Sequence, residues 1–199
     1  ARLDTFGKPA GYVLRQVDGW RRRWEDAITP DTVNCDATIK WLMDNMPAES
    51  GRASVIHNDY KMDNVIFSLQ DPLQVIGVLD WEMSTVGDPL MDLGCTLGYW
   101  TQISDPDFFR ESRTMPSDIE GAPTRAEIIA RFQQQTGLAV DNFPFYFCFG
   151  LFRLAVIGQQ IYYRYYHGLT RDQRFAGFIK KTHVLQQMCE LIISGKISS

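Results

Sequence analysis

The sequence predicts an α+β fold that is mostly helical and contains one small β-hairpin. Apolar residues recur at helical spacing through most of the 199 residues, whereas residues 54–80 hold short runs of β-branched residues. The chain is 45% hydrophobic and 13% aromatic, a composition that supports a well-buried core. We therefore expect residues 1–199 to form a single domain.

Two amphipathic helices are expected before the β-element. In residues 12–28 the apolar side chains recur at helical spacing, and the three arginines at 21–23 fall mostly on the other side. We interpret this basic run as a solvated helix face rather than as a phosphate-binding patch. A shorter repeat over residues 35–46 predicts a second helix, which ends before Pro47.

The middle of the chain changes to the pattern of strands. The runs "SVIH", "NVIFSL" and "QVIGVLD" are short and β-branched, and "QDPL" joins the last two with an Asp-Pro turn signal. This pattern predicts a small hairpin with a loop at each end. The polar residues 57–64 form the loop that enters the hairpin, and Asp80 lies where its last strand ends.

Helices return after the β-element. Asp88 offers an N-cap with Pro89 at the first helical position, and leucines follow at helical spacing. Residues 102–123 hold three prolines among polar residues and predict a long irregular loop. A capping-box spacing that begins at Thr124 marks the start of another helix. Two longer helices are then expected, roughly over residues 145–167 and 172–193.

Charge and composition exclude several classes of function. A formal net charge of −4 gives no broad basic field, so neither nucleic acid nor a membrane surface is expected as a partner. The apolar segment 143–161 contains Pro144 and Arg153, which favours a buried helix over a membrane span. The cysteines lack zinc-site spacing and are interpreted as reduced thiols of a cytoplasmic protein. They are Cys35, Cys95, Cys148 and Cys189.

One polar constellation has the groups that phosphoryl transfer from a nucleotide requires. That chemistry needs a carboxylate to orient the acceptor hydroxyl, oxygen ligands for Mg²⁺ and positive charge near the transferred group. Asp59 supplies the carboxylate, and Asn64 and Asp80 supply an amide oxygen and a charged oxygen for the metal. Lys61 follows Asp59 by two residues and is placed to reach the γ-phosphate.

Two sequence blocks resemble a known family. "HNDYKMDN", followed by "VLDWEMSTVGDPLMDLG", is similar to the catalytic loop and metal-binding segment of the aminoglycoside phosphotransferase and choline kinase group, relatives of the protein kinases. The later text "FGLFRLAVIGQQIYYRYYHGLT" and the phrase "GDPLMDLG" are most similar to the branch whose members occur alone or fused to acyl-CoA dehydrogenases. The resemblance covers nearly the whole chain.

The resemblance implies a fold, a reaction and catalytic roles. The chain would be the C-terminal lobe of a protein-kinase-like phosphotransferase that uses ATP and Mg²⁺ to phosphorylate a hydroxyl of a small molecule. Its hairpin would carry the catalytic and metal loops. Asp59 would be the catalytic base, and Lys61 would approach the transferred phosphate. Asn64 and Asp80 would bind the metal and, through it, the nucleotide.

Supporting roles follow for the neighbouring residues. His57 would hold the catalytic loop's backbone rather than carry a proton, although a satisfied half-buried histidine also accounts for it. Asp92, inside the following helix, would anchor the loop through its backbone amides, and Asp88 is also explained as that helix's N-cap. The commonest form of the motif has Gly where this chain has Asn58, which would alter the loop's backbone without removing a reacting group.

The helices after residue 124 would form the acceptor wall, because this region varies with substrate in the family's fold. An aromatic-rich and only mildly acidic wall does not suit a polycationic aminoglycoside. The resemblance points instead to a hydroxylated acyl compound, such as a hydroxyacyl-CoA, although most of residues 143–166 also fit a core at helical spacing. The candidate lining residues are Tyr99, Trp100, Arg153, Gln159, Tyr162 and Tyr163, and Glu82 is a candidate metal or substrate contact.

The family's other nucleotide-binding wall is not apparent in this sequence. The resemblance places that wall in an N-terminal lobe with a five-stranded sheet and a phosphate-covering loop. Here no Gly-rich loop follows a strand, and the segment before His57 is helical. The opening residues "ARLDTFGKPAG" also lack an initiator Met and a signal sequence. We therefore expect the N-terminal lobe to be absent from this chain and the fragment alone to be inactive.

The sequence leaves two other functions open. A catalytically incomplete C-lobe could bind a ligand or a partner through its aromatic wall. A metal hydrolase could use His57, Asp59 and Asp80, and it would bind a transition metal tightly. For the kinase, the expected partners are a nucleotide and a small-molecule hydroxyl acceptor. The oligomeric state is left open, a dimer included.

Overall fold

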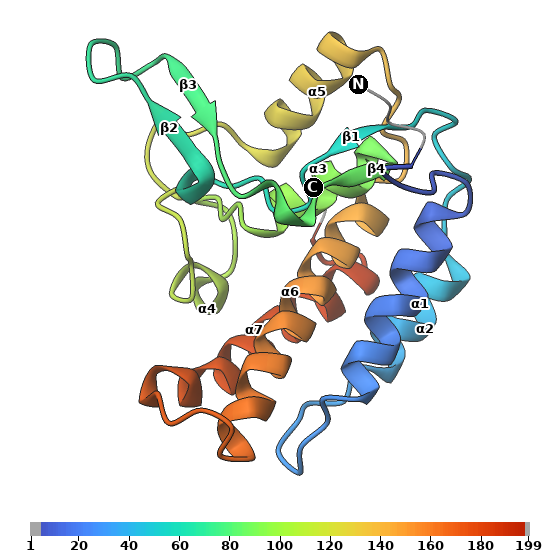
Figure 1. The fold of residues 1–199 in the computed structure, drawn as a ribbon, viewed down its shortest axis with the longest axis vertical. Coiled ribbons are helices and arrows are strands. Elements are labelled where there is room, and N and C mark those ends of the chain that lie inside the picture. Colours follow the sequence, from blue (N-terminus) through green and yellow to red (C-terminus); the bar gives the residue numbers. More distant parts are fainter. Residues whose placement is uncertain (1–4, 198–199) are drawn as a thin grey trace.

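The computed structural model describes residues 5–197 and has the α+β, mostly helical fold that the sequence predicts (Figure 1). Its longest helix is α6 (Phe143–Tyr166). The last expected helix begins as a 3₁₀ helix, η3 (Gln173–Gly177), and continues as α7 (Phe178–Ile193). The other helices are α1 (Tyr12–Glu25), α2 (Asp36–Asp44), α3 (Pro89–Gly98), α4 (Asp107–Arg110) and α5 (Arg125–Thr136), with 3₁₀ helices η1 (Met62–Asn64) and η2 (Trp81–Met83).

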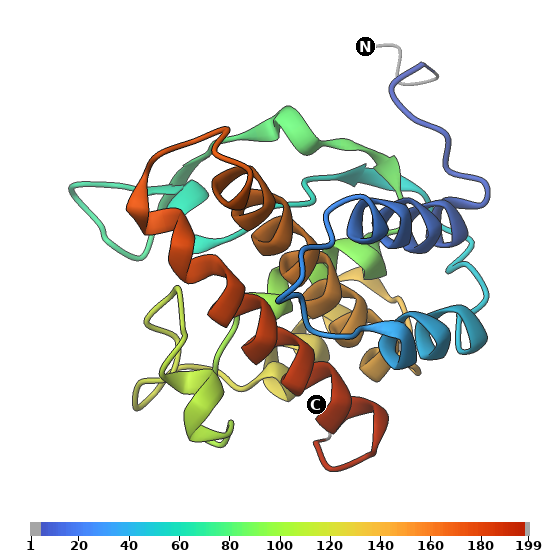
Figure 2. The same cartoon turned by 90° about the horizontal axis from the view of Figure 1, so that it is seen from below.

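Helix α6 forms the centre of the core because it is apolar on nearly every side. Most of its length is buried against α1, α3 and α7, as the view from below shows (Figure 2). A helix that is hydrophobic all round belongs in a protein core or in a membrane. No helix within residues 5–197 is long and apolar enough to cross a membrane. The expectation of a buried helix in this segment is therefore confirmed.

The β-element consists of two antiparallel pairs rather than one hairpin. Strands β2 (Val65–Phe67) and β3 (Val75–Val78) form the expected hairpin. Strand β1 (Ser54–Ile56) pairs with β4 (Thr85–Gly87), a strand that the sequence pattern does not predict. β4 is three residues long and its partner lies far upstream, so no local alternation marks it. The pairing brings the two ends of segment 57–84 together beside α3.

Helices α3 and α6 cross with their backbones in contact. A Cβ atom added at Gly94 would overlap the backbone carbonyl of Tyr146, and one at Gly150 would overlap the carbonyl of Gly94. Only glycine leaves room for so close an approach. Because Asp88 and Asp92 lie at the start of α3, this crossing also fixes the position of both carboxylates.

Gly94→Ala is expected to lower the free energy of unfolding by about 1–3 kcal/mol, because the added methyl group has to push α3 away from α6. Urea denaturation followed by circular dichroism would measure the change. Gly177→Ala is the matched control, since a methyl group there meets open space and φ is −73°. Equal stability of the two variants would contradict the tight crossing.

The segment between α3 and α5 is irregular, as predicted, apart from the short helix α4. A buried ion pair ties it to the core. Arg125 is fully buried, and its guanidinium donates to the carboxylate of Asp105 at 2.5 and 2.8 Å. At the start of α5, Thr124 and Glu127 form the capping box that their spacing predicts.

Candidate active site

His57 holds the loop of residues 57–64 to the end of strand β3. Its ring Nε2 lies 2.7 Å from the carbonyl oxygen of Leu79, and Nδ1 accepts the backbone N–H of Asp59 at 3.2 Å. A carbonyl can only accept and an amide N–H can only donate, so this geometry favours a neutral ring protonated on Nε2. The ring is buried against Trp81. His57 thus has no free nitrogen for proton transfer or metal binding.

Asp92 holds the same loop from helix α3. Its carboxylate accepts the backbone N–H groups of His57 at 2.9 Å and Asn58 at 2.7 Å. Asp88, one turn earlier, caps the helix by accepting the N–H of Leu90, and its other oxygen accepts the N–H of Ser50. The two carboxylates therefore fasten the segments on either side of β1 to the start of one helix, where negative charge is favoured.

Asp92→Ala is expected to lower the free energy of unfolding by about 2–4 kcal/mol, because two backbone N–H groups lose a charged acceptor. The loop should also open more often, and amide hydrogen exchange of Asn58 and Asp59 would report this. Asp141→Ala, at an exposed aspartate outside the site, is the control. Unchanged exchange protection in Asp92→Ala would contradict the anchoring role.

Asn58 and Asp80 both have a left-handed backbone, each with a φ of 65°. No other non-glycine residue among 5–197 has a positive φ. Such positions cluster at functional sites, where the surrounding structure enforces them. The Asn58 side chain accepts the Tyr12 hydroxyl at 3.2 Å and donates to the Met83 carbonyl at 2.9 Å. Asparagine tolerates this backbone better than most residues, which accounts for Asn58 where the resembling motif has Gly.

The Asp59 carboxylate is the centre of the site. One oxygen accepts the Tyr99 hydroxyl at 2.7 Å, and the other accepts Lys61 Nζ at 2.8 Å and Asn64 Nδ2 at 3.1 Å. Burial alone would raise the pKa of Asp59, but the hydrogen bonds from Lys61 and Tyr99 outweigh it and lower the pKa below its usual value. The carboxylate is therefore ionised at neutral pH.

Asn64 and Asp80 lie at the same end of the β2–β3 hairpin. Val65 pairs with Val78, and the N–H of Leu79 donates to the Asn64 carbonyl at 2.8 Å. The Asn64 amide nitrogen donates to the neighbouring carboxylate, which leaves its amide oxygen for another partner. One amide oxygen and one carboxylate fit Mg²⁺, which is usually held by one or two protein groups together with phosphates.

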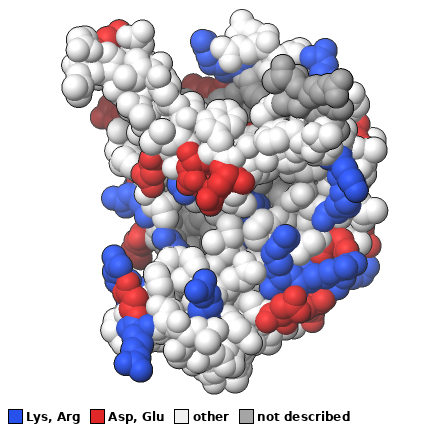
Figure 3. Space-filling model, in the orientation of Figure 1, with Lys and Arg blue, Asp and Glu red and all other residues white. Residues whose placement is uncertain are grey.

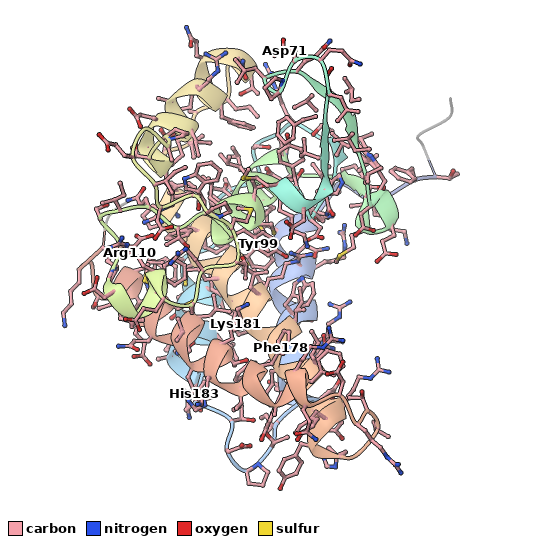
Figure 4. The ribbon with its side chains drawn as sticks, turned by 90° about the vertical axis from the view of Figure 1, so that its left-hand side faces the viewer. Asp71, Tyr99, Arg110, Phe178, Lys181 and His183 are labelled. Carbon is pink, nitrogen blue, oxygen red and sulfur yellow. The ribbon has the colours of Figure 1, made fainter. Side chains whose placement is uncertain are left out.

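An apolar pocket of about 180 Å³ opens beside Tyr99. Leu154 of α6 and Phe178 of α7 are among its walls, and Arg113 and Lys181 add positive charge. Figure 4 shows Tyr99, Lys181 and Phe178 near one another on this side of the molecule. Burial lowers the pKa of Lys181. A contribution from α7 was not predicted, because a lysine on an amphipathic helix usually marks a solvated face.

Three residues predicted to line the acceptor wall lie elsewhere. Gln159 is fully buried and donates to the Ala27 carbonyl at 2.9 Å, in the α1–α2 connection. Tyr162 donates to Asp31 of the same connection at 2.6 Å, and Tyr163 lies in the last turn of α6. A 24-residue helix is roughly 36 Å long, so the last turns of α6 extend beyond the site. Gln159 contacts the α1–α2 connection although Ile157 and Gly158 line the pocket beside Tyr99. Helical spacing shows which residues share a face of a helix but not which element that face contacts.

The remaining candidates differ in their surroundings. The Trp100 indole donates to the Pro123 carbonyl at 2.9 Å and its ring packs on the core, so it does not line the site. Glu82 is exposed in η2, where acidic side chains gather above a hollow on this face (Figure 3). Arg153 is buried beside Met83, with Nη2 3.4 Å from the sulfur. Of the predicted acceptor residues, Tyr99 and Arg153 therefore lie near the loop.

Comparison with known proteins shows which sequences this chain resembles. The model described as "Phosphotransferase enzyme family" matches residues 1–127. Acyl-CoA dehydrogenase family member 10 of Mus musculus is 35% identical over 191 residues, which cover 95% of this chain and 17% of that protein. Acyl-CoA dehydrogenase family member 11 of Homo sapiens is 33% identical over 170 residues, which cover 84% of this chain and 21% of that protein. The chain thus spans about a fifth of these curated relatives.

A solved structure has the same fold. A putative aminoglycoside phosphotransferase from Ralstonia eutropha JMP134 superposes with a TM-score of 0.82 at 29% identity, over 97% of this chain and 58% of that one. The family match covers more than half of this chain and includes the loop centred on Asp59 together with Asp80 and Asp92. This chain therefore belongs to the phosphotransferase enzyme family.

Proposed function

We propose that this chain is the catalytic and acceptor-binding part of a kinase that transfers the γ-phosphoryl group of ATP to a hydroxyl of a small molecule. The main support is the arrangement around Asp59, where Lys61 and Asn64 lie within hydrogen-bonding distance and Asp80 ends the adjoining strand. This arrangement combines orientation, positive charge and metal ligands in one place. Membership of a phosphotransferase family supports the same reaction class.

In this proposal Asp59 orients the acceptor hydroxyl. Its lowered pKa keeps the carboxylate ionised, so it can accept the hydroxyl proton as the bond to phosphorus forms. The Tyr99 hydroxyl donates to one carboxylate oxygen at 2.7 Å, and an acceptor hydroxyl would bind at the same oxygen. The Lys61 ammonium, which is paired with the other oxygen at 2.8 Å, would supply positive charge to the transferred group.

Asn64 and Asp80 would hold Mg²⁺, and through it the nucleotide. When bound, the metal would neutralise charge on the phosphates. The protein's part is to present two oxygens at fixed positions. Strand pairing fixes Asn64 just before β2, and Asp80, two residues after β3, has a left-handed backbone with a φ of 65°.

We further propose a hydroxylated acyl compound, such as a hydroxyacyl-CoA, as the acceptor. The pocket beside Tyr99 is lined mainly by apolar side chains, which suit a hydrocarbon chain better than a polar sugar. Arg113 and Lys181 disfavour a polycation there. The relatives named as acyl-CoA dehydrogenase family members support the same substrate class.

A second nucleotide-binding wall would come from an N-terminal lobe outside this chain. The β2–β3 hairpin exposes many apolar side chains, and Leu69 and Leu73 in its connection are 97% and 91% exposed. Exposed apolar patches of this kind mark interaction surfaces. The solved neighbour is longer than this chain, which covers 58% of it. We propose that the additional lobe packs against this hairpin.

The two other functions left open by the sequence have less support. Both ring nitrogens of His57 contact the backbone, so a hydrolase site built on His57, Asp59 and Asp80 lacks a histidine ligand. Within residues 5–197 no group of three His, Cys, Asp or Glu side chains is placed to hold a metal ion. The binding module remains the alternative to a kinase.

A substrate screen of the full-length gene product with ATP and Mg²⁺ tests the proposed function. Hydroxyacyl-CoAs, choline-like alcohols and aminoglycosides would be offered in parallel, and mass spectrometry would identify phosphorylated products. We expect transfer to a hydroxyacyl-CoA and none to an aminoglycoside. Transfer to none of the three classes would contradict the kinase and favour the binding module.

A further inference from the structure

Arg153 is a buried charge without a matching partner. The residue is 2% exposed in the middle of α6. Its Nη1 has no hydrogen-bond partner among residues 5–197, and Nη2 contacts the Met83 sulfur at 3.4 Å. The guanidinium also lies 5.1 Å from the centre of the Trp20 ring. Buried guanidinium groups normally donate to carboxylates or carbonyls, so this one has donors left for a ligand.

A second buried arginine shows how this protein satisfies such a charge internally. Arg125 is 0% exposed, and its two terminal nitrogens donate to Asp105 at 2.5 and 2.8 Å, leaving Nε as its one unpaired nitrogen. That pair joins two segments of the fold and needs no ligand. Among the ion pairs of the described residues, none includes Arg153.

Arg153 lines a pocket between α1 and the loop of residues 57–64, with a volume of about 410 Å³. Within the described residues 5–197, no acidic residue lines it. Figure 3 shows basic side chains beside the hollow on this face and acidic side chains above it. We call this pocket the basic pocket, after its four basic lining residues Lys8, Arg15, Arg23 and Arg153.

The basic pocket adjoins the catalytic loop. Asn58, which lines it, donates to the Met83 carbonyl at 2.9 Å and immediately precedes Asp59. On α6, Arg153 is followed by Leu154, which lines the apolar pocket. An acceptor whose hydroxyl is bound at Asp59 therefore lies near the positively charged basic pocket and near the apolar pocket, which are separated by helix α6.

We propose that the basic pocket binds an ionised carboxylate or phosphate group of the acceptor, with Arg153 as the principal contact. An arginine presents two parallel donors that match two oxygens of either anion. A neutral or cationic molecule leaves this charge buried and unpaired, so the pocket selects anionic acceptors. Assigning the anion to the acceptor rests on the proposed kinase function, whereas the anion site itself does not.

Methyl NMR of the full-length protein tests the anion site in the absence of nucleotide and turnover. The Met83 methyl group is the reporter, because its sulfur lies 3.4 Å from Arg153, and Met83→Leu assigns its signal. Titration with inorganic phosphate and, separately, with propionate should shift this signal to saturation. Arg153→Gln should weaken anion binding roughly ten- to hundred-fold, as the loss of a charged hydrogen bond implies.

Three variants control this experiment. Arg15→Gln removes a charge from the exposed rim of the basic pocket and should weaken binding up to about fivefold, which keeps the test valid even if Arg153→Gln does not fold. Arg22→Gln, on the same helix but outside the pocket, should leave binding unchanged. Lys61→Gln should also leave it unchanged, which separates this site from phosphate bound at the catalytic loop.

The proposal is supported if the anions shift the Met83 signal to saturation and if Arg153→Gln weakens this binding. The anion that binds more tightly shows whether the pocket is suited to a phosphate or to a carboxylate group. No shift with either anion, or equal affinity in Arg153→Gln and the parent chain, would overturn it. In the full-length kinase, Arg153→Gln should raise KM for an anionic acceptor more than it lowers kcat. If the protein binds the anion but transfers no phosphate, the proposed kinase function would be contradicted and the anion site would not.

Discussion

Asp59→Asn in the full-length protein is expected to reduce phosphate transfer by about 10²–10⁴-fold. The amide cannot accept the hydroxyl proton as a carboxylate does, and it loses the charge attraction to Lys61 at 2.8 Å. It keeps the size of the side chain and can still bond to Tyr99, so we expect the fold to stay intact. Steady-state kinetics should show a lower kcat with little change in KM.

The matched control for this variant is Asp63→Asn. Asp63 is an exposed carboxylate in the same loop, so its neutralisation changes the local charge equally without touching the Asp59 cluster. Its kcat should stay close to that of the parent protein, and both variants should unfold at similar temperatures. Undiminished turnover in Asp59→Asn would rule out the catalytic assignment.

Asp80→Asn is expected to remove most of the affinity that Mg²⁺ adds to nucleotide binding, roughly ten- to hundred-fold in Kd. Asp80 is the charged member of the candidate metal pair, and the neutral amide of Asn64 alone is a weak ligand. Asparagine is chosen because it tolerates the φ of 65°, which would strain an alanine. Calorimetry of the full-length protein with ADP, with and without Mg²⁺, would measure the loss.

Variants at two further carboxylates test whether the loss of Mg²⁺-dependent affinity is specific to Asp80. Asp71 lies in the β2–β3 connection, far from the loop end of the hairpin (Figure 4), so Asp71→Asn should bind ADP like the parent protein. Glu82→Gln shows whether the neighbouring exposed acid adds to metal binding. The assignment of Asp80 fails if its variant retains the full Mg²⁺-dependent gain in affinity.

The cluster around Asp59 could be predicted because its groups lie close together in the chain, whereas its catalytic role stays a prediction. Asp59, Lys61 and Asn64 fall within a few residues, and a single hairpin determines where the chain returns at Asp80. Because these residues are close in the sequence, few backbone conformations can connect them. Their residue types and their order were therefore enough to predict that they lie together. The supporting hydrogen bonds to Asp92 depend on a helix placed only by tertiary packing, and the resemblance supplied that expectation rather than spacing.

The acceptor side was harder to predict because it depends on how helices pack. The apolar repeat of α6 does not distinguish Leu154, which lines the apolar pocket, from Gln159, which is bonded to the α1–α2 connection. Strand β4 was missed because it is defined by its pairing with β1 and not by a local pattern. Whether Arg153 Nη1 has a partner among residues 5–197 likewise depends on every element packed around it, so no sequence pattern reports that it has none.

Helices α3 and α6 cross at Gly94 and Gly150, and different residues of α6 set the position of α3 and the shape of the apolar pocket. Gly150 sets the backbone contact that holds α3, whereas Leu154 and Ile157, one and two turns further along, face the apolar pocket. Exchanging Ile157 would change the shape of the apolar pocket, whereas a change at Leu154 would also reach α3, because Leu154 lies against Gly98. A variant library at Ile157 is therefore expected to change which acceptors the proposed kinase takes while the loop that Asp92 holds keeps its position.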